Sequence, residues 1–220
     1  MNLNYQIMMQ SLLGGMWMSF KIFAVTLLFS LPLGLIIALG RMSKNIIIKN
    51  IFRIYISIMR GTPLMLQLFV VYFGPYYMFG ISLTPNSRIY ACFVGFALNY
   101  AAYFAEIYRG GIESIPKGQY EAANVLGYTK LQTFGKIILP QVVKRIIPSV
   151  TNEVITLVKD TSLAFAISVM EMFTIAKQFA SGSRSMIPYV AAGILYYIFN
   201  FVVAWLMERL EKKLNYYHEK

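Results

Sequence analysis

Long apolar runs separated by short basic clusters dominate the chain. Five of these runs reach about 20 mostly apolar residues, the length that an α-helix needs to cross a bilayer. They predict transmembrane helices near residues 18–39, 54–80, 89–108, 142–163 and 188–207. We therefore expect an all-α membrane protein in which residues 1–220 form a single transmembrane domain.

Two interruptions modify this pattern. Arg60-Gly61-Thr62-Pro63 lies inside the second run, and proline disfavours helical geometry in the residue before it. Residues 163–180 are apolar but too short to cross comfortably, and they contain Glu171. We expect this segment to form a re-entrant or interfacial helix on the outer side.

The distribution of lysine and arginine predicts the orientation. Basic residues concentrate on the cytoplasmic side of a membrane protein. If the five runs cross, one side carries fourteen basic residues: Arg41, Lys44, Lys49, Arg53, Arg109, Lys117, Lys130, Lys136, Lys144, Arg145, Arg209, Lys212, Lys213 and Lys220. The other side carries three: Arg88, Lys177 and Arg184. This bias places the loop 109–141 and the carboxyl terminus in the cytoplasm and the amino terminus outside.

Composition excludes several classes of protein. The chain is 58% hydrophobic and only 13% charged, and its net charge of +11 is clustered between apolar runs, which indicates membrane topology rather than nucleic-acid binding. The single cysteine, Cys92, and the single histidine, His218, provide no disulfide, metal site or catalytic pair. The chain has no glycine-rich phosphate loop of the Walker type. We therefore expect no catalytic residues, no metal and no cofactor in this chain.

The loop 109–141 is unusually long and polar for a membrane protein. Pro116 stands where a helix often begins, ahead of residues 117–132, and Pro140 ends the second part of the loop. Its central residues follow a pattern: Glu121-Ala122-Ala123, then Gly127, then Ile137 and Leu139-Pro140.

Each residue type in this pattern suits a docking helix. Ala122 and Ala123 are small and favour helix, which permits close approach to a partner. Glu121 can accept charge-assisted hydrogen bonds from a basic partner residue. Gly127 permits the left-handed turn that ends a short helix. An ordinary amphipathic surface helix is the alternative.

The pattern resembles the cytoplasmic "EAA" loop of the permease subunits of bacterial ATP-binding cassette (ABC) importers. The resemblance implies a coupling helix, a turn and a second helix that seat in a groove on an ATPase subunit, with Glu121, Ala122, Ala123 and Gly127 as the coupling residues. It also implies that ATP is bound and hydrolysed on a separate ATPase dimer. Further implied partners are a second permease subunit, identical or similar, and an extracytoplasmic binding protein, and the implied location is the bacterial inner membrane.

Two other segments are similar to permeases for polar amino acids. They are Arg60-Gly61-Thr62-Pro63-Leu64 with Gln67-Leu68-Phe69, and Lys159-Asp160-Thr161-Ser162-Leu163. The first string fits a simple helix break at the inner interface equally well.

Charged residues inside a predicted crossing indicate a substrate pathway. A charge at the helix centre costs about 2.5–3.5 kcal/mol on insertion scales, so such groups face a pathway or one another. Glu153, Thr156 and Asp160 share one helix face, and Lys159 lies on its flank. Glu153 and Asp160 could bind the ammonium of an amino acid and Lys159 its carboxylate. For Lys159 and Asp160, an internal ion pair that locks two helices together is an equal alternative.

Three polar residues on other runs are candidate walls of the same substrate site. Asn99 and Tyr103 are four residues apart and so lie on one helix face, and Tyr72 has a comparable depth. Tyrosine in a membrane protein also serves as interfacial packing, which is the alternative for both tyrosines.

These observations predict the permease subunit of an ATP-driven importer of polar amino acids, basic ones included, that works by alternating access. One alternative is an importer of the same class with another small solute, in which substitutions at Glu153 and Asp160 would leave amino-acid uptake unchanged. The other is a membrane assembly protein without transport, which would give no ATP-dependent flux.

Overall fold

A computed structural model describes residues 4–214, and every regular element in that part of the chain is helical. Lys220 and His218, used in the sequence analysis, lie outside the described residues. The helices are α1 (Tyr5–Arg41), α2 (Ile46–Gly61), α3 (Leu64–Phe79), α4 (Pro85–Glu113), α5 (Lys117–Val125), α6 (Lys130–Gln132), α7 (Leu139–Asp160), α8 (Met172–Ser183) and α9 (Ile187–Leu214). A π-helical segment, Thr133–Ile138, leads into α7, and a 3₁₀ segment, Thr161–Ile167, follows it. The expected all-α class is confirmed.

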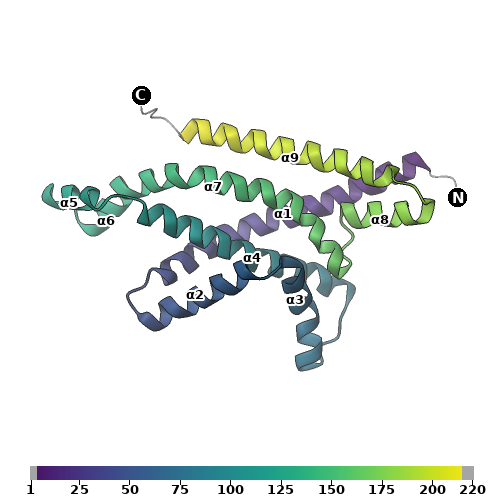
Figure 1. Ribbon diagram of the computed structural model, residues 1–220, viewed down its shortest axis with the longest axis horizontal. Helices are drawn as coiled ribbons and strands as arrows, with labels where there is room; N and C mark the ends of the chain where they lie inside the picture. The colour runs from purple at the N-terminus through teal and green to yellow at the C-terminus, as the bar shows by residue number, and fades with distance from the viewer. Residues whose placement is uncertain (1–3, 215–220) are drawn as a thin grey trace.

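The molecule is elongated, and α1, α4, α7 and α9 run along its length (Figure 1). The elements α5 and α6 and the last turns of α9 lie at one end, called here the α5 end. The start of α1 and the short helix α8 lie at the other, called the α8 end (Figure 1). The pair α2 and α3 projects from one side of the bundle.

Small residues allow α1 and α4 to pack closely. Ser19, Thr26, Ser30 and Gly34 recur at helical spacing along α1 and are all buried. A Cβ added to Gly34 would lie 2.9 Å from the Cβ of Phe104 in α4, so the two backbones approach at this point. Such stripes are typical of helix interfaces in membranes, where close packing replaces the hydrophobic effect.

The expected crossing at 54–80 is not one continuous helix. The chain bends by 111° between α2 and α3, at the Arg60-Gly61-Thr62-Pro63 break that the sequence indicates. Side chains hold this bend: Gln67 Nε2 lies 2.9 Å from the carbonyl oxygen of Met59, and Asn99 Nδ2 donates to the same oxygen at 3.0 Å. The Asn99 amide also donates to Gln67 Oε1, at 2.9 Å. The bend therefore rests on α4 as well as on Pro63.

Length and composition identify two to four membrane-spanning segments among residues 4–214, against the five expected. Within residues 4–214, α1 and α9 are long and apolar enough to span a bilayer alone. Two bent pairs, α2 with α3 and the segment 130–167 with α8, raise the number to four if each is one span. The α4 helix, which contains the expected crossing 89–108, is not among them. Asn99, Glu106 and the tyrosines of α4 lower its mean hydropathy, although residues such as Phe96 and Ala101 are buried in the bundle.

Two other expected boundaries shift. The first helix begins already at Tyr5 rather than near residue 18, and its 37 residues extend over about 55 Å at 1.5 Å per residue. In the segment 163–180, the backbone of Ser168 is left-handed, with φ of 57°, and the helix that follows is α8. The chain bends by 58° at this break, and α8 begins at Met172 rather than at residue 163; the expected re-entrant or interfacial position on the outer side stays a prediction.

Candidate functional site

The structure brings a tyrosine of α4 onto the carboxylate of Asp160. The Tyr100 hydroxyl donates to Asp160 Oδ2 at 2.7 Å, and Tyr100 itself is only 2% exposed. Glu153 lies two turns earlier on the continuous helix α7, half-buried, and interacts electrostatically with Asp160 and with Arg60. These contacts place two acidic side chains on one stretch of α7, beside α4.

The cationic partners of these two carboxylates, Arg60 for Glu153 and Lys159 for Asp160, lie beyond ion-pair distance. Among the residues that the structure describes, no ion pair within 4 Å involves Glu153, Lys159 or Asp160. Lys159 is exposed, whereas Thr156 and Asp160 are half-buried. The internal Lys159–Asp160 ion pair, the alternative raised by the sequence, is therefore not formed in this part of the chain.

The other three candidate residues have structural contacts of their own. Asn99 is 4% exposed, and its amide is engaged at the α2–α3 bend. The Tyr72 hydroxyl accepts a hydrogen bond from Arg88 Nε at 3.1 Å, and the Tyr103 ring lies 5.3 Å from the guanidinium carbon of Arg60. These residues lie on α3 and α4, and the contacts described for them are with the α2–α3 bend, Arg88 and Arg60 rather than with the α7 carboxylates.

Sequence reasoning missed Tyr100, Gln67 and Arg60 as members of this region. Tyr100 lies in a stretch rich in aromatic residues and alanine, a composition typical of a buried helix face. Its partner, Asp160, is evident only from the packing of α4 against α7. Gln67 was noted as part of a string, without a structural role.

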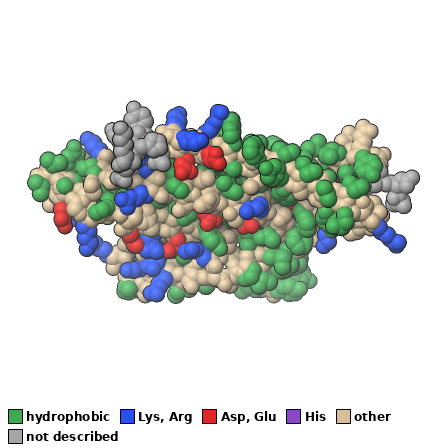
Figure 2. Space-filling model, turned by 45° about the horizontal axis from the view of Figure 1, so that its top comes forward, with side chains coloured by type: hydrophobic (Ala, Val, Ile, Leu, Met, Phe, Trp, Pro, Cys, Tyr) green, Lys and Arg blue, Asp and Glu red, His purple; other side chains and the backbone are tan. Residues whose placement is uncertain are grey.

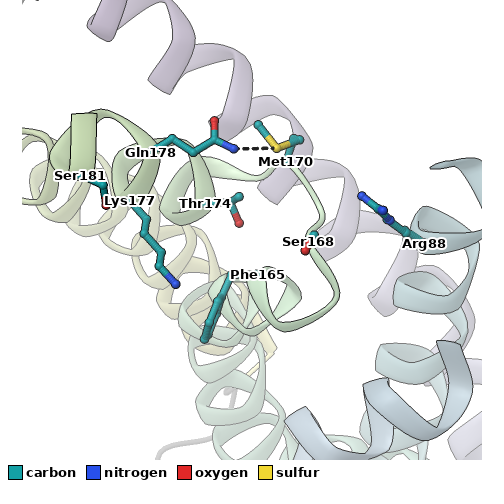
Figure 3. Close-up of a pocket in the computed structure, with 8 residues that line it drawn as sticks. All are labelled: Arg88, Phe165, Ser168, Met170, Thr174, Lys177, Gln178 and Ser181. Carbon is teal, nitrogen blue, oxygen red and sulfur yellow. Dashed lines mark hydrogen bonds between the residues drawn. The ribbon is translucent and has the colours of Figure 1, made fainter. Parts of the chain in front are cut away.

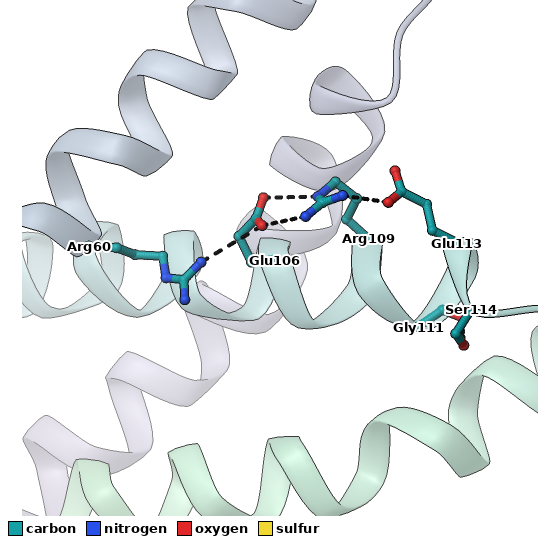
Figure 4. A network of polar contacts seen from close by, with 6 residues as sticks. All are labelled: Arg60, Glu106, Arg109, Gly111, Glu113 and Ser114. Carbon is teal, nitrogen blue, oxygen red and sulfur yellow. Dashed lines mark hydrogen bonds and ion pairs between the residues drawn. The ribbon is translucent and has the colours of Figure 1, made fainter.

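Arg60 also belongs to an ion network between the end of α2 and the last turns of α4 (Figure 4). Its Nη1 lies 3.7 Å from Glu106, whose carboxylate accepts two hydrogen bonds from Arg109, at 3.0 and 2.7 Å. Arg109 also pairs with Glu113, one turn further along α4. The network links the α2–α3 bend to the start of the 109–141 loop.

The loop 109–141 folds as two short helices joined by a glycine turn. Gly127 has φ of +78°, and the amide of Tyr128 donates to the carbonyl of Ala123 at 3.1 Å, while that of Gly127 donates to Asn124 at 3.0 Å. These two bonds form a Schellman motif, which requires a left-handed residue at the position of Gly127. Thr129 then caps α6 through a reciprocal pair of hydrogen bonds with Gln132. The expected helix–turn–helix is present, with the turn at the expected glycine.

The tip of this loop exposes apolar side chains. Val125, Leu126 and Leu131 are 87%, 73% and 85% exposed, and together they are called here the elbow patch. Glu121 and Ala122 are exposed nearby. Ala123, in contrast, is 1% exposed and packs inside the chain, so it cannot itself touch a partner. An exposed apolar cluster at a helix tip is typical of a protein interface.

A cavity of about 620 Å³ opens at the α8 end (Figure 3). Two basic side chains border it, Arg88 of α4 and Lys177 of α8, and Lys177 Nζ lies 5.3 Å from the centre of the Phe165 ring. The remaining lining residues are Ser168 and Met170 in the bend before α8, and Thr174, Gln178 and Ser181 on α8 itself. This cavity has no acidic lining residue, and so differs from the α7 site.

Comparison with known families decides the class. The model of the family described as "Binding-protein-dependent transport system inner membrane component" matches residues 30–216. The chain belongs to this family. The match covers the candidate site on α7 and the 109–141 loop, which agrees with the ABC-importer resemblance of the sequence.

Individual relatives of this permease family support the assignment. The chain is 36% identical over 209 residues to the L-cystine transport system permease protein TcyB of Bacillus subtilis, covering 94% of this chain and 88% of the relative. It is 34% identical to a putative glutamine transport system permease protein, GlnP, of Rickettsia bellii, covering 91% of both. The fold matches that of a chain from the crystal structure of an amino acid ABC transporter with histidines, with a TM-score of 0.86, 29% identity, and coverage of 97% and 100%. The chain is thus a membrane permease component and not a catalytic subunit.

Proposed function

We propose that this chain is the transmembrane permease subunit of an ATP-driven ABC importer for polar amino acids, with a preference for basic ones. The observation that carries the proposal is the pair of carboxylates on α7, Glu153 and Asp160, with Tyr100 donating to Asp160. The relatives and the matching structure, named for amino-acid transport, support the class of cargo.

The charge balance of the α7 site favours a cationic group. A half-buried carboxylate without an ion pair within the described chain is stabilised when an ammonium or guanidinium group approaches it. Glu153 and Asp160 then bind the α-ammonium or a basic side chain. Lys159, exposed at the flank, binds the substrate carboxylate, while Thr156, Asn99, Tyr72 and Tyr103 border the path.

The arrangement of the ends supports the proposed topology. The loop with α5 and α6 and the last turns of α9 lie at one end of the molecule, and the start of α1 lies at the other (Figure 1). With the α5 end in the cytoplasm, the amino terminus faces outward and five segments cross the inner membrane. The cavity beside α8 then faces the extracytoplasmic binding protein that delivers the substrate.

The elbow patch supports coupling to a separate ATPase dimer. Glu121, Ala122 and the patch seat in the ATPase, and Gly127 sets the angle between α5 and α6. ATP-driven closure of the ATPase moves this elbow, and α7, which continues from it, moves the carboxylate site between inward and outward access. A second permease subunit, identical or similar, completes the pathway.

Transport in proteoliposomes tests the cargo site. The complex of this chain with its ATPase and binding protein is reconstituted with Glu153→Ala, and uptake of arginine and of glutamine is measured. Because a charge-assisted contact contributes about 1.5–3 kcal/mol, we expect arginine uptake to fall about tenfold or more. Glutamine uptake is expected to fall less.

The matched control is Glu208→Ala, an exposed carboxylate on α9. Copurification of the ATPase with each variant reports assembly separately. If Glu153→Ala leaves the kinetics of arginine uptake unchanged, Glu153 is not part of the substrate site. If no amino acid stimulates the ATPase activity of the wild-type complex, the cargo is another solute. Absence of any ATP-dependent flux from the wild-type complex would indicate an assembly role.

A further inference from the structure

A second basic cavity, called here the α2 pocket, lies at the α5 end. It has a volume of about 470 Å³ and lies where the end of α1, the helix α2 and the end of α4 meet. Figure 2 shows a dense group of lysine and arginine side chains over this part of the surface, at the lower left. The pocket is lined by Arg41, Met42, Lys49, Arg53, Arg109 and Glu113.

Most of the positive charge in the α2 pocket is not balanced within the described chain. Arg109 is paired with both Glu106 and Glu113 (Figure 4). Among residues 4–214, no hydrogen bond or ion pair involves the side chains of Arg41, Lys49 or Arg53. Three cationic groups thus converge on one cavity whose only acidic lining residue, Glu113, is already engaged. An anion that enters it gains favourable interactions with all three.

The helix α2 has the character of a helix at a membrane surface. Ile47, Ile51, Ile54 and Ile58 recur at helical spacing and are each more than half exposed, and so form one apolar stripe. Lys49 and Arg53 lie four residues apart on nearly the opposite face of the same helix. The helix thus carries an apolar stripe on one side and basic residues on the other, the pattern of an amphipathic helix that lies among anionic lipid headgroups.

We propose that the α2 pocket binds the phosphate group of an anionic membrane phospholipid. Arg41, Lys49 and Arg53 contact the phosphate, and the isoleucine stripe on the other side of α2 holds the helix at the depth of the lipid headgroups. Basic pockets between helices on the cytoplasmic side suit such headgroups. The site lies next to the Arg60–Glu106–Arg109 network, so a bound lipid stabilises the junction between the α2–α3 bend and the coupling loop.

Lipid binding to the full chain tests this site directly. Native mass spectrometry with added phosphatidylglycerol or phosphatidylcholine is compared for the wild type and for Lys49→Gln/Arg53→Gln. Each basic residue near a headgroup contributes about a factor of five in affinity, so the double variant should bind phosphatidylglycerol about 30-fold more weakly. Phosphatidylcholine, which has no net charge, should bind weakly to both.

Two matched variants separate this result from misfolding and from general charge. Lys212→Gln/Lys213→Gln removes the same charge from an exposed part of α9 at the same end and should retain phosphatidylglycerol. Lys49→Arg/Arg53→Lys keeps the charge and should also retain it. Equal loss in the α9 variant, or no loss in the α2 variant, overturns the proposal.

Two further measurements distinguish other occupants. Displacement of phosphatidylglycerol by an excess of inorganic phosphate would identify a free-phosphate site instead of a lipid site. Loss of the lipid when the ATPase subunits bind would show that the partner covers the pocket, which also overturns the proposal. Retention in both measurements supports it.

Discussion

Removal of the buried carboxylate of Glu171 should loosen α8 from the bundle. Glu171 is fully buried and caps α8: its oxygens accept from the amides of Phe173 and Thr174, both at 2.7 Å, and from the Thr174 hydroxyl at 2.8 Å. The Tyr196 hydroxyl of α9 donates to it at 2.9 Å. One side chain thus joins the start of α8 to α9.

The expected cost of Glu171→Ala follows from these four contacts. Loss of an N-cap costs about 0.5–2 kcal/mol, and a buried donor that loses its acceptor, such as the Thr174 hydroxyl, costs about 1–3 kcal/mol. The two effects together predict a loss of about 1.5–5 kcal/mol in the free energy of unfolding. The 12 residues of α8 are too few to stabilise the helix alone, so its docking depends on this contact.

The single cysteine provides the assay. Cys92 is fully buried in the core, so a thiol-reactive dye reports thermal unfolding of the purified chain. Glu171→Ala should lower the midpoint clearly, and Glu171→Gln, which keeps one acceptor oxygen, should fall between it and the wild type. Glu208→Ala, an exposed carboxylate on α9, is the control and should leave the midpoint unchanged. If the unfolding midpoint of Glu171→Ala equals that of Glu208→Ala, the Glu171 carboxylate does not hold α8 against the bundle and the reasoning is wrong.

Three other substitutions test separate contacts. Gly127→Val forces a branched side chain into the left-handed turn, at a cost of about 1–2 kcal/mol, and should reduce the substrate-stimulated ATPase activity of the complex. Gly127→Asn should retain most of that activity. Normal stimulation in the valine variant would contradict the coupling role. Gly15→Ala places a Cβ 2.8 Å from the Cα of Met172 and should lower the midpoint of thermal unfolding detected by the dye, because overpacking costs about 1–3 kcal/mol. Gly14→Ala, whose Cβ would have nothing within 4 Å, should leave the midpoint unchanged. Equal midpoints for the two variants would show that α1 and α8 separate easily. Tyr100→Phe removes the donor to Asp160 and should change the affinity for arginine, measured by ATPase stimulation, without lowering complex yield; an unchanged affinity would place Asp160 outside the substrate site.

The candidate site was only partly accessible to sequence reasoning. The carboxylates on α7 were identifiable because charge is rare inside an apolar run and because helical spacing places Glu153 and Asp160 on one face. Tyr100 was not, since its partner lies on a helix 60 residues away in sequence. Asn99 was expected to face the substrate, yet its amide holds the α2–α3 bend, a contact that depends on how α4 lies against that bend.

Local patterns in the sequence determined the helical class, the break at Gly61-Thr62-Pro63 and the glycine turn of the coupling loop, because proline, glycine and hydrophobic period act over a few residues. Only the tertiary structure decided that α2 and α3 diverge by 111°, that Ala123 packs inward and that three cations without ion pairs in the described chain share one pocket. Those outcomes depend on the packing between helices distant in the sequence, and no local pattern encodes that packing.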